Sequence, residues 1–326
     1  MHLGEKAAAQ RPGTRLRALL KEHRPLVIPG CYDAMSARVL EHVGFGAIYM
    51  SGYGSSLALL GLPDAGLITL TEMAMNARLI ASAVRVPVIA DADTGYGNAL
   101  NAIRTVEEYI RAGVAGLHME DQVAPKRCGH VAGREVIPRE EAVRKIRAAC
   151  AARDAMDPEV VIIARTDSRG AHGGSLDEAI WRANAFLDAG ADLAFVEGPA
   201  SVAEVERICR EVKGGRVFYN MTGISPRFTE KEMADLGIAA CILPGVAMRA
   251  TLMALYDIAR ALKDQGTAAE PEFDRRYRAH PMGDLHGFSG FARIRALEEQ
   301  FLPPEAGEKY ADSLGYRPPE APKAAE

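Results

Sequence analysis

Four carboxylates stand at or just beyond the ends of apolar, strand-like runs: Asp64, Asp91, Asp93 and Glu120. A buried carboxylate is costly unless it meets a cation or a metal ion. A cluster of oxygen donors alone suits Mg²⁺ or Mn²⁺ and not zinc, and Mg²⁺ keeps several waters, so that one or two of these side chains need touch it. The alternative is that the acids form salt bridges with Arg165 or Arg127, or cap helices.

One cysteine stands in unusual surroundings, in the segment PKRCGH at residues 125–130. Two cations and an imidazole flank Cys128, and such neighbours lower a thiol pKa, which predicts a thiolate or ready proton transfer near neutral pH. Gly129 and Gly133 allow this segment to move as a lid over a substrate. If Cys128 is not the proton donor, Tyr49 and His130 are the next candidates.

Two arginines are natural partners for substrate carboxylates, because a guanidinium binds a carboxylate through two parallel hydrogen bonds. Arg165 ends a strand-like run and Arg249 follows the last one, which favours an anionic ligand with several carboxylates. Each arginine could instead neutralise the acid cluster. His118 and Glu120 share one face if their segment is a strand, and the role of His118 stays open. Further predicted strand ends carry Tyr49, Ser51, Gly52, Glu197, Asn220 and Thr222 as candidate site residues.

These side chains need elements that bring them together, and the sequence repeats one pattern eight times: a short apolar run, a Gly, Pro or Asp cluster, then an amphipathic segment. The near-continuous apolar runs are typical of parallel strands buried on both faces. Eight such units predict a closed (β/α)8 barrel, or TIM barrel, with its site at the carboxyl ends of the strands. An open doubly wound sheet is the alternative. The predicted strands span residues 26–31, 47–52, 86–91, 116–121, 160–166, 193–198, 216–222 and 240–245.

Composition narrows the class of protein. The 326 residues carry 39 Lys plus Arg and 43 Asp plus Glu, a formal net charge of −4 that argues against a nucleic-acid platform. No apolar run approaches the roughly 20 residues of a membrane span. The five scattered cysteines suggest no disulfide framework, which favours the cytoplasm. We expect the barrel and an N-terminal lead-in over residues 1–262, and a helical extension with a mobile tail over 263–326.

At these residues the sequence resembles the isocitrate lyase and phosphoenolpyruvate mutase superfamily, and in particular its methylisocitrate lyase branch, over roughly residues 26 to 262. The segment KRCGH is the most specific part, because it resembles the lyases, whereas the mutases carry a cysteine-free loop there. Further matching segments are PGCYDAMSARVLEHVGFGAIYMSG, GLPDAGLITL, VPVIADADTGYGNALNAIRTV, IIARTDS, FVEGPA, NMTG and LPGVAMRA.

The resemblance implies a Mg²⁺-dependent carbon–carbon lyase in which Asp91 holds the metal, while Asp64, Asp93 and Glu120 support it largely through water. It implies that Cys128 is the acid/base, that Ser51 and Gly52 meet the 2-oxo-acid half of the substrate, and that Arg165 grips a carboxylate and the developing oxyanion. The residues said to complete the pocket are Gly129, His130, Glu197, Asn220 and Arg249. The family also implies a homotetramer whose last helices swap between subunits.

Two features of the sequence conflict over the substrate. The segments FVEGPA and RTDSRGAHG look more like the dimethylmalate lyase and petal death protein group, whereas Arg249 resembles the methylisocitrate lyases. The segment NMTGISP departs from the methylisocitrate lyases, which usually carry a Glu-Phe-Gly stretch there. The leading hypothesis is a lyase that cleaves 2-methylisocitrate to pyruvate and succinate, or a 2-alkylmalate. An oxaloacetate hydrolase or decarboxylase is the alternative, and a metabolite-binding barrel without activity is a third hypothesis.

Overall fold

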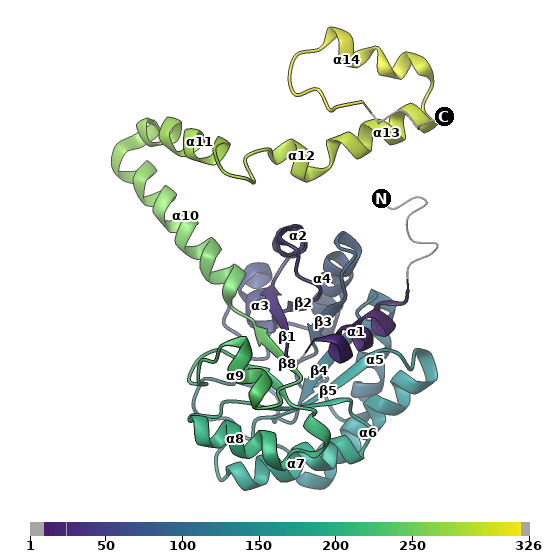
Figure 1. The fold of residues 1–326 in the computed structure, drawn as a ribbon, viewed down its shortest axis with the longest axis vertical. Helices are drawn as coiled ribbons and strands as arrows, with labels where there is room; N and C mark the ends of the chain where they lie inside the picture. Colours follow the sequence, from purple (N-terminus) through teal and green to yellow (C-terminus); the bar gives the residue numbers. More distant parts are fainter. Residues whose placement is uncertain (1–9, 24, 321–326) are drawn as a thin grey trace. The chain divides into compact units, whose positions relative to one another are not determined.

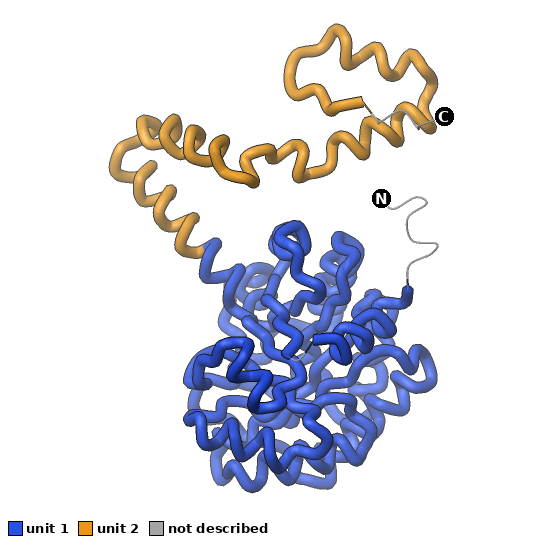
Figure 2. Tube along the Cα trace, viewed as in Figure 1, with its two compact units in different colours: residues 1–251 blue, residues 252–326 orange. Residues whose placement is uncertain are grey.

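The computed structural model describes residues 10–23 and 25–320, which form two compact units, residues 1–251 and 252–326 (Figure 2). The first unit contains every strand of the described chain. The second consists of helices and turns. The predicted boundary at residue 262 lies within the helix that leads from the first unit into the second, so the division in space comes earlier.

Eight parallel strands form the first unit, in the order β6-β5-β4-β3-β2-β1-β8-β7. The two end strands, β6 and β7, meet through a bridge between Ala194 and Val217, and the Ala194 N–H donates to the Arg216 carbonyl at 2.8 Å. The sheet is therefore a nearly closed barrel, as predicted, and not an open doubly wound sheet. The strands are β1 Leu26–Cys31, β2 Ile48–Met50, β3 Val88–Asp91, β4 Gly116–Glu120, β5 Val161–Thr166, β6 Leu193–Val196, β7 Phe218–Asn220 and β8 Ala240–Leu243.

Helices surround these strands (Figure 1). Several begin at a side-chain cap, as at Thr69, whose side chain accepts from the backbone N–H of Glu72, and several end at a left-handed glycine such as Gly113. The helices of the first unit are α1 Pro12–Glu22, α2 Ala34–Val43, α3 Gly52–Leu60, α4 Leu70–Ala83, α5 Ala99–Ala112, α6 Arg139–Met156, α7 Leu176–Asp188, α8 Val202–Glu211 and α9 Glu230–Asp235, with a 3₁₀ turn at Lys213–Gly215.

The core has an inner and an outer layer because side chains alternate along each strand. Ile48, Ala90 and Ile162 pack outward against the helices, whereas Tyr49 and Ile163 pack inside the barrel. Leu16 of α1 belongs to the inner cluster and is fully buried, so this helix fills the amino end of the barrel. The opposite end, where the strands finish, is left for polar side chains.

Helix α10, Val246–Gln265, begins in the first unit and continues into the second. It has no buried residue over its 20 residues although it carries many apolar side chains. The remaining elements are α11 Glu270–Arg278, α12 Leu285–Ser289, α13 Phe291–Phe301 and α14 Lys309–Asp312, with 3₁₀ turns at Gly266–Ala269 and Pro304–Gly307. Residues 1–9 of the predicted lead-in and the last six residues of the predicted tail lie outside the described residues.

Two expectations from composition can be compared with the structure. All five cysteines are free. Within the described residues, no helix combines the length and the apolar character that a membrane crossing requires.

Candidate active site

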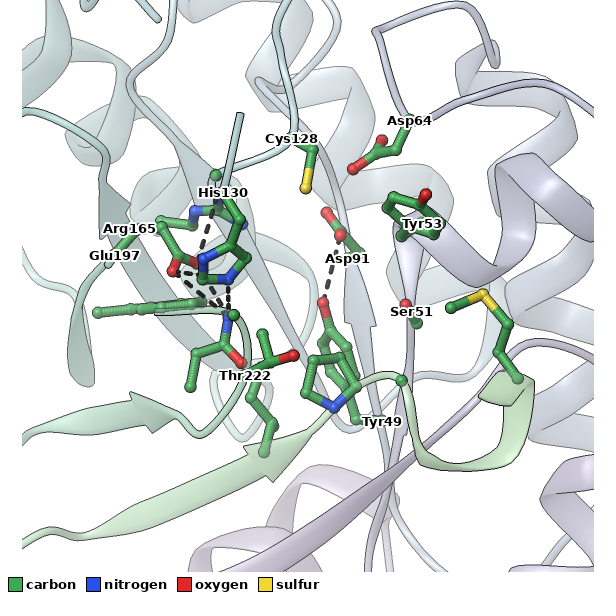
Figure 3. Close-up of a pocket in the computed structure, with 18 of the residues that line it drawn as sticks. Tyr49, Ser51, Tyr53, Asp64, Asp91, Cys128, His130, Arg165, Glu197 and Thr222 are labelled. Carbon is green, nitrogen blue, oxygen red and sulfur yellow. Dashed lines mark hydrogen bonds and ion pairs between the residues drawn. The ribbon is translucent and has the colours of Figure 1, made fainter. Parts of the chain in front are cut away.

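A cavity of about 230 Å³ opens at the carboxyl ends of the strands (Figure 3). The close-up shows the sulfur of Cys128 and the carboxylates of Asp64 and Asp91 on one side of it, and His130, Arg165 and Glu197 grouped on the other. It is lined by Tyr49, Ser51, Tyr53, Asp64, Asp91, Cys128, Gly129, His130, Arg165, Phe195, Glu197, Asn220, Thr222, Gly223, Ile242, Pro244, Gly245, Met248 and Arg249.

Asp91, the last residue of β3, is held by donors from three sides. Its carboxylate accepts from the Tyr49 hydroxyl at 3.2 Å, from the Gly52 N–H at 3.1 Å and from the Asp93 N–H at 2.9 Å. A Cβ on Gly52 would lie 2.4 Å from Asp91 Oδ2, so only glycine lets the backbone approach this carboxylate. Asp91 is therefore fixed by hydrogen bonds with its carboxylate on the cavity wall.

Asp91 is ionised at pH 7 although it is buried. Desolvation opposes this charge, but His118, Lys126 and Arg165 together lower the pKa of Asp91 to about 2. His118 Nε2 lies 2.7 Å from the Tyr49 hydroxyl, and burial lowers the pKa of His118 to about 4. Because His118 is then neutral at pH 7, Lys126 and Arg165 are the cations that Asp91 faces. The prediction that His118 and Glu120 both point inward is confirmed, since each contacts a residue inside the barrel.

Lys126 lies among the predicted metal ligands. Its Nζ is 2.5 Å from Asp64 Oδ1 and 3.3 Å from Asp93 Oδ1, and the side chain is buried. Burial raises the pKa of Asp93 to about 6, although the Lys126 ammonium opposes this. The backbone of Asp93 is in the left-handed region, with a φ of 52°. The sequence offered Arg127 as a salt-bridge partner for the acids; the structure shows its neighbour Lys126 in that place.

Two of the predicted metal ligands offer a cation oxygen atoms at the cavity. Asp64 and Asp91 both line the cavity and offer only oxygen atoms, which is what Mg²⁺ prefers. Among the residues that the structure describes, no three His, Cys, Asp or Glu side chains converge closely enough to enclose an ion. The residues therefore fit an ion that has one or two protein ligands and keeps its waters, as Mg²⁺ does. Asp93 and Glu120 lie outside the cavity lining, and their support of a metal through water stays a prediction.

Arg165, on β5, is surrounded by three carboxylates. It donates through Nε and Nη2 to Asp167 at 2.9 and 3.1 Å, and its guanidinium lies 3.1 Å from Glu120 and 3.5 Å from Glu197. Burial raises the pKa of Glu120 well above its ordinary value, even though Arg165 opposes this. The predicted salt bridge between Arg165 and the acid cluster is therefore present at Glu120, while Arg165 also lines the cavity.

The pKa of Cys128 differs from the lowered value that the sequence predicts. Burial raises the pKa of the thiol, and the backbone N–H of His130 and the cations Arg165 and Lys126 lower it by less, so the thiol keeps its proton at pH 7. The prediction of a lowered pKa was wrong because it counted charges along the sequence and not burial. The Cys128 N–H donates to the Asp64 carbonyl at 3.1 Å, which fixes this part of the chain beside the carboxylates.

His130, Glu197 and Asn220 form a connected group on the far side of the cavity. The Asn220 side-chain amide donates to Glu197 Oε2 at 3.0 Å, and His130 Nε2 lies 3.4 Å from Glu197 Oε1. Gly129 is packed so closely that a Cβ there would lie 2.5 Å from Arg165 Nη2 and 2.6 Å from Glu197 Cγ. The segment that carries Cys128 is therefore seated directly on Arg165 and Glu197.

Two helix N-termini also face the cavity. Ser51 caps α3 and lines the cavity together with Tyr53, while Gly245 and Arg249 line it at the start of α10. Helix N-termini carry partial positive charge and favour anions. With Arg165 and Arg249 they give this opening a preference for a ligand that bears carboxylates.

All but three of the predicted site residues line this one cavity; the exceptions are Gly52, Asp93 and Glu120, each of which contacts a residue that does. Sequence reasoning missed Tyr53 and Gly223, and gave Lys126 no place among the acids. It also missed the residues of an apolar wall, three of which lie inside the predicted strands 193–198 and 240–245 and one of which lies just beyond the second. These wall residues are Phe195, Ile242, Pro244 and Met248.

A barrel whose strand ends gather carboxylates, arginines and one cysteine around a small cavity is an enzyme scaffold for a small anionic ligand. The comparisons identify the family. Residues 16–263 match the family model described as phosphoenolpyruvate phosphomutase, and this chain belongs to the phosphoenolpyruvate mutase and isocitrate lyase superfamily.

Several relatives show which members it resembles. The chain is 43% identical over 289 residues to 2,3-dimethylmalate lyase of Eubacterium barkeri, covering 88% of this chain and 97% of that protein. It is 40% identical over 286 residues to 2-methylisocitrate lyase of Aeropyrum pernix, covering 87% and 90%. A solved structure of oxaloacetate acetylhydrolase with the inhibitor 3,3-difluorooxalacetate superposes with a TM-score of 0.81 at 33% identity, covering 89% and 97%. The predicted superfamily and the assignment as a carbon–carbon lyase are confirmed.

Proposed function

We propose that this protein cleaves the bond between C2 and C3 of a 2-hydroxy di- or tricarboxylate that carries an alkyl group, with Mg²⁺ or Mn²⁺, and releases a 2-oxo acid. The leading substrates are 2-methylisocitrate, which would give pyruvate and succinate, and 2-alkylmalates. One observation carries the proposal: the Cys128 thiol, the Asp91 carboxylate and the Arg165 guanidinium all face the same cavity.

The charged and the apolar parts of the cavity would bind different parts of the substrate. Arg165, Arg249 and the N-termini of α3 and α10 favour carboxylates, while Phe195, Ile242, Pro244 and Met248 offer a surface for an alkyl substituent. The likeness to dimethylmalate and methylisocitrate lyases supports both leading substrates. The apolar wall favours a branched substrate over unsubstituted malate.

Asp91 and Asp64 would hold the cation, Asp91 directly. A bound Mg²⁺ would supply charge stabilisation for the oxygens of the forming 2-oxo acid. Asp91 stays ionised because Lys126 and Arg165 offset its burial, and Tyr49 and Gly52 keep its carboxylate oriented.

Cys128 would supply the proton that cleavage requires. When the C2–C3 bond breaks, the 2-hydroxyl becomes the carbonyl and loses its proton to solvent, while the electron pair of the broken bond stays on C3 next to a carboxylate. This carbanion must be protonated, and the thiolate left by that step regains its proton from solvent. A buried thiol with a raised pKa still holds its proton at pH 7, so Cys128 can donate it. Arg165 would hold the carboxylate whose negative charge grows in this step, and the closely packed Gly129 would keep water away.

The test is a panel of 2-hydroxy di- and tricarboxylates with Mg²⁺, read by release of the 2-oxo acid and by mass spectrometry of both products. Pyruvate with succinate, or a 2-oxo acid with a second carboxylate, supports the lyase. Turnover of none of these compounds, with or without Mg²⁺ or Mn²⁺, contradicts it.

An oxaloacetate hydrolase or decarboxylase is the second candidate, favoured by the likeness to the oxaloacetate acetylhydrolase structure. Oxaloacetate, assayed beside the panel, separates these reactions, because a hydrolase turns it into acetate and oxalate, whereas a decarboxylase releases CO₂ and pyruvate. Proton donation by Cys128 belongs to the lyase reaction in particular.

The proposal extends to assembly and location. A homotetramer would cover the apolar side chains that α10 and the second unit expose, such as Tyr256 and Phe301. Five free cysteines are typical of a protein kept in a reducing cytoplasm.

A further inference from the structure

The segment between β4 and α6 leaves the barrel and returns to it, and it carries Cys128 at its tip. We call residues 123–135 the thiol loop. Its base is closed by an antiparallel bridge between Gln122 and Val136 and by a hydrogen bond from the Val123 N–H to the Glu135 carbonyl at 2.9 Å. The tip is held by the Cys128 N–H, which donates to the Asp64 carbonyl, so the remaining question is what fixes the part of the loop that returns toward α6.

Arg134, near the end of the thiol loop, lies in a fitted slot on the segment between β5 and α7. Its guanidinium donates to Asp167 Oδ1 at 3.1 Å although the side chain is buried, and its carbonyl accepts from the His172 N–H at 2.9 Å. A Cβ on Gly170 would lie 2.1 Å from Arg134 Nη2, so the guanidinium occupies the space that any side chain at residue 170 would need. Two chain segments are thus shaped to fit each other at this arginine.

The Asp167 carboxylate accepts hydrogen bonds from two arginines. Its Oδ1 accepts from Arg134 and also from Arg165 Nη2 at 3.1 Å, while its Oδ2 accepts from Arg165 Nε at 2.9 Å. Asp167 is fully buried, and its own N–H donates to Asp121 at 2.9 Å, which fixes the carboxylate on the barrel. One immobile carboxylate therefore joins the thiol loop to the arginine of the cavity.

The thiol loop meets Arg165 a second time at its tip, where Gly129 leaves no room for a Cβ beside Arg165 Nη2. Arg165 is therefore aligned from behind by Asp167 and packed in front by the loop. Displacing the loop frees one side of Arg165, and releasing Arg134 leaves Asp167 with a single cation. Neither Arg134 nor Asp167 lines the cavity, so both act through Arg165 and the loop.

We propose that Arg134 is a latch that seats the thiol loop, and that Asp167, shared by Arg134 and Arg165, couples the seating of Cys128 to the alignment of Arg165. Arg134 and Asp167 are positioning residues, and only their expected effect on turnover rests on the proposed function.

The latch can be tested without any substrate, through the rate at which iodoacetamide labels Cys128, measured peptide by peptide with mass spectrometry. Hydrogen bonds to charged groups are worth enough to change an opening equilibrium by about tenfold or more, so Arg134→Gln should raise the labelling rate of Cys128 by about that factor. The loss of a nearby cation would by itself raise the thiol pKa and slow labelling, so faster labelling reports opening. Cys31 and Cys150 are buried elsewhere in the barrel and should label no faster.

Two further variants sharpen the test. Gly170→Ala keeps Arg134 but fills its slot, and residue 170 lies outside the left-handed region, so alanine is tolerated by the backbone. It should mimic Arg134→Gln. Arg169→Gln is the matched control, because it removes the same charge from the segment that forms the slot but from a side chain that pairs with Glu204 at 2.7 Å. It should leave the labelling of Cys128 unchanged.

The coupling has its own readout. Arg165→Lys keeps the charge near the thiol but loses the fork that holds Asp167, and it should also raise the labelling rate of Cys128, by less when Arg134→Gln is already present. Unchanged labelling of Cys128 in both Arg134→Gln and Gly170→Ala overturns the latch, whatever the enzyme turns over. If Cys31 labels faster in Arg134→Gln, that variant has opened globally and Gly170→Ala decides. If the effects of Arg134→Gln and Arg165→Lys on the labelling rate of Cys128 are strictly additive, the coupling is overturned but the latch is not.

Discussion

The pKa of the Cys128 thiol depends more on burial than on the charged residues next to it in the chain. The cation next but one to it, Lys126, points to Asp64 and Asp93, so its field at the sulfur is largely cancelled by those carboxylates. Desolvation then decides, and the pKa of Cys128 rises. A sequence shows which charges lie near a thiol along the chain, but not toward which atoms a long lysine side chain extends.

Replacement of the thiol tests its part in catalysis. We expect Cys128→Ser to keep substrate and Mg²⁺ binding but to lose about 10²- to 10⁴-fold in turnover, because a hydroxyl is a far weaker acid than a thiol. Steady-state kinetics with calorimetric binding separates the two effects. Cys209→Ser, at a half-buried cysteine outside the cavity, is the control. A serine variant that keeps more than about a tenth of the wild-type rate would contradict the assignment.

The raised pKa of Cys128 predicts how alkylation depends on pH. Because the thiolate is the reactive form and the folded-state pKa lies above the ordinary value, labelling at pH 7 should be slow and should keep rising through pH ~8.5, where an unperturbed thiol is half ionised. The measurement is the labelling rate of the Cys128 peptide between pH 6 and 10. A plateau reached by pH ~7 would show a thiolate and restore the prediction made from the sequence.

Asp91 is the residue on which a divalent ion should depend most. We expect Asp91→Ala to abolish Mg²⁺ binding in a calorimetric titration and to reduce oxo-acid release to background, because the ion loses the carboxylate that Tyr49 and Gly52 hold on the cavity wall. Asp235→Ala removes an exposed carboxylate that pairs with Lys231 and should change neither quantity. Full activity in excess EDTA would exclude the metal requirement.

At the scale of elements, the alternation of strands and helices could be predicted because each strand is a buried apolar run and each helix an amphipathic one. The period of two along β4 was enough to place His118 and Glu120 on the inner face. The ion pairs were less predictable: whether Glu120 meets a metal or Arg165 depends on side-chain rotamers. Met248 of the apolar wall was missed because it comes from the start of a helix, where sequence patterns mark no inward face.

The thiol loop is the element whose position should matter most to turnover. In Gly129→Ala the new Cβ would lie 2.5 Å from Arg165 Nη2, so the loop or the guanidinium must shift. A displacement of about 1 Å can cost on the order of 10²-fold in rate, and we expect such a loss in kcat/KM with little change in the thermal midpoint. Gly46→Ala is the control, since its Cβ would meet only ordinary contacts with Leu19. Equal activity in both variants would show that the loop adapts freely.

At the scale of the whole molecule, the chain exposes more apolar surface than the barrel explains. Helix α10 buries no residue, and Leu255 and Phe301 are 59% and 61% exposed. Such side chains on a single chain are expected to be covered by a second copy. Four copies of the 35.1 kDa chain would have a mass of about 140 kDa, and we expect light scattering after gel filtration to give this value.

Charge placed on this surface should break the assembly. The double variant Leu255→Glu with Phe301→Glu puts two carboxylates where apolar contacts form between copies, and burial of an unpaired charge costs several kcal/mol, so we expect smaller species. Gln265→Glu with Gln300→Glu adds the same charge to exposed polar positions of the same two helices, α10 and α13, and should keep the assembly intact. Because the cavity is lined by residues 49–249 alone, the dissociated variant should still bind a 2-oxo acid with Mg²⁺. If the wild type already runs as a monomer, these apolar side chains serve some purpose other than self-assembly.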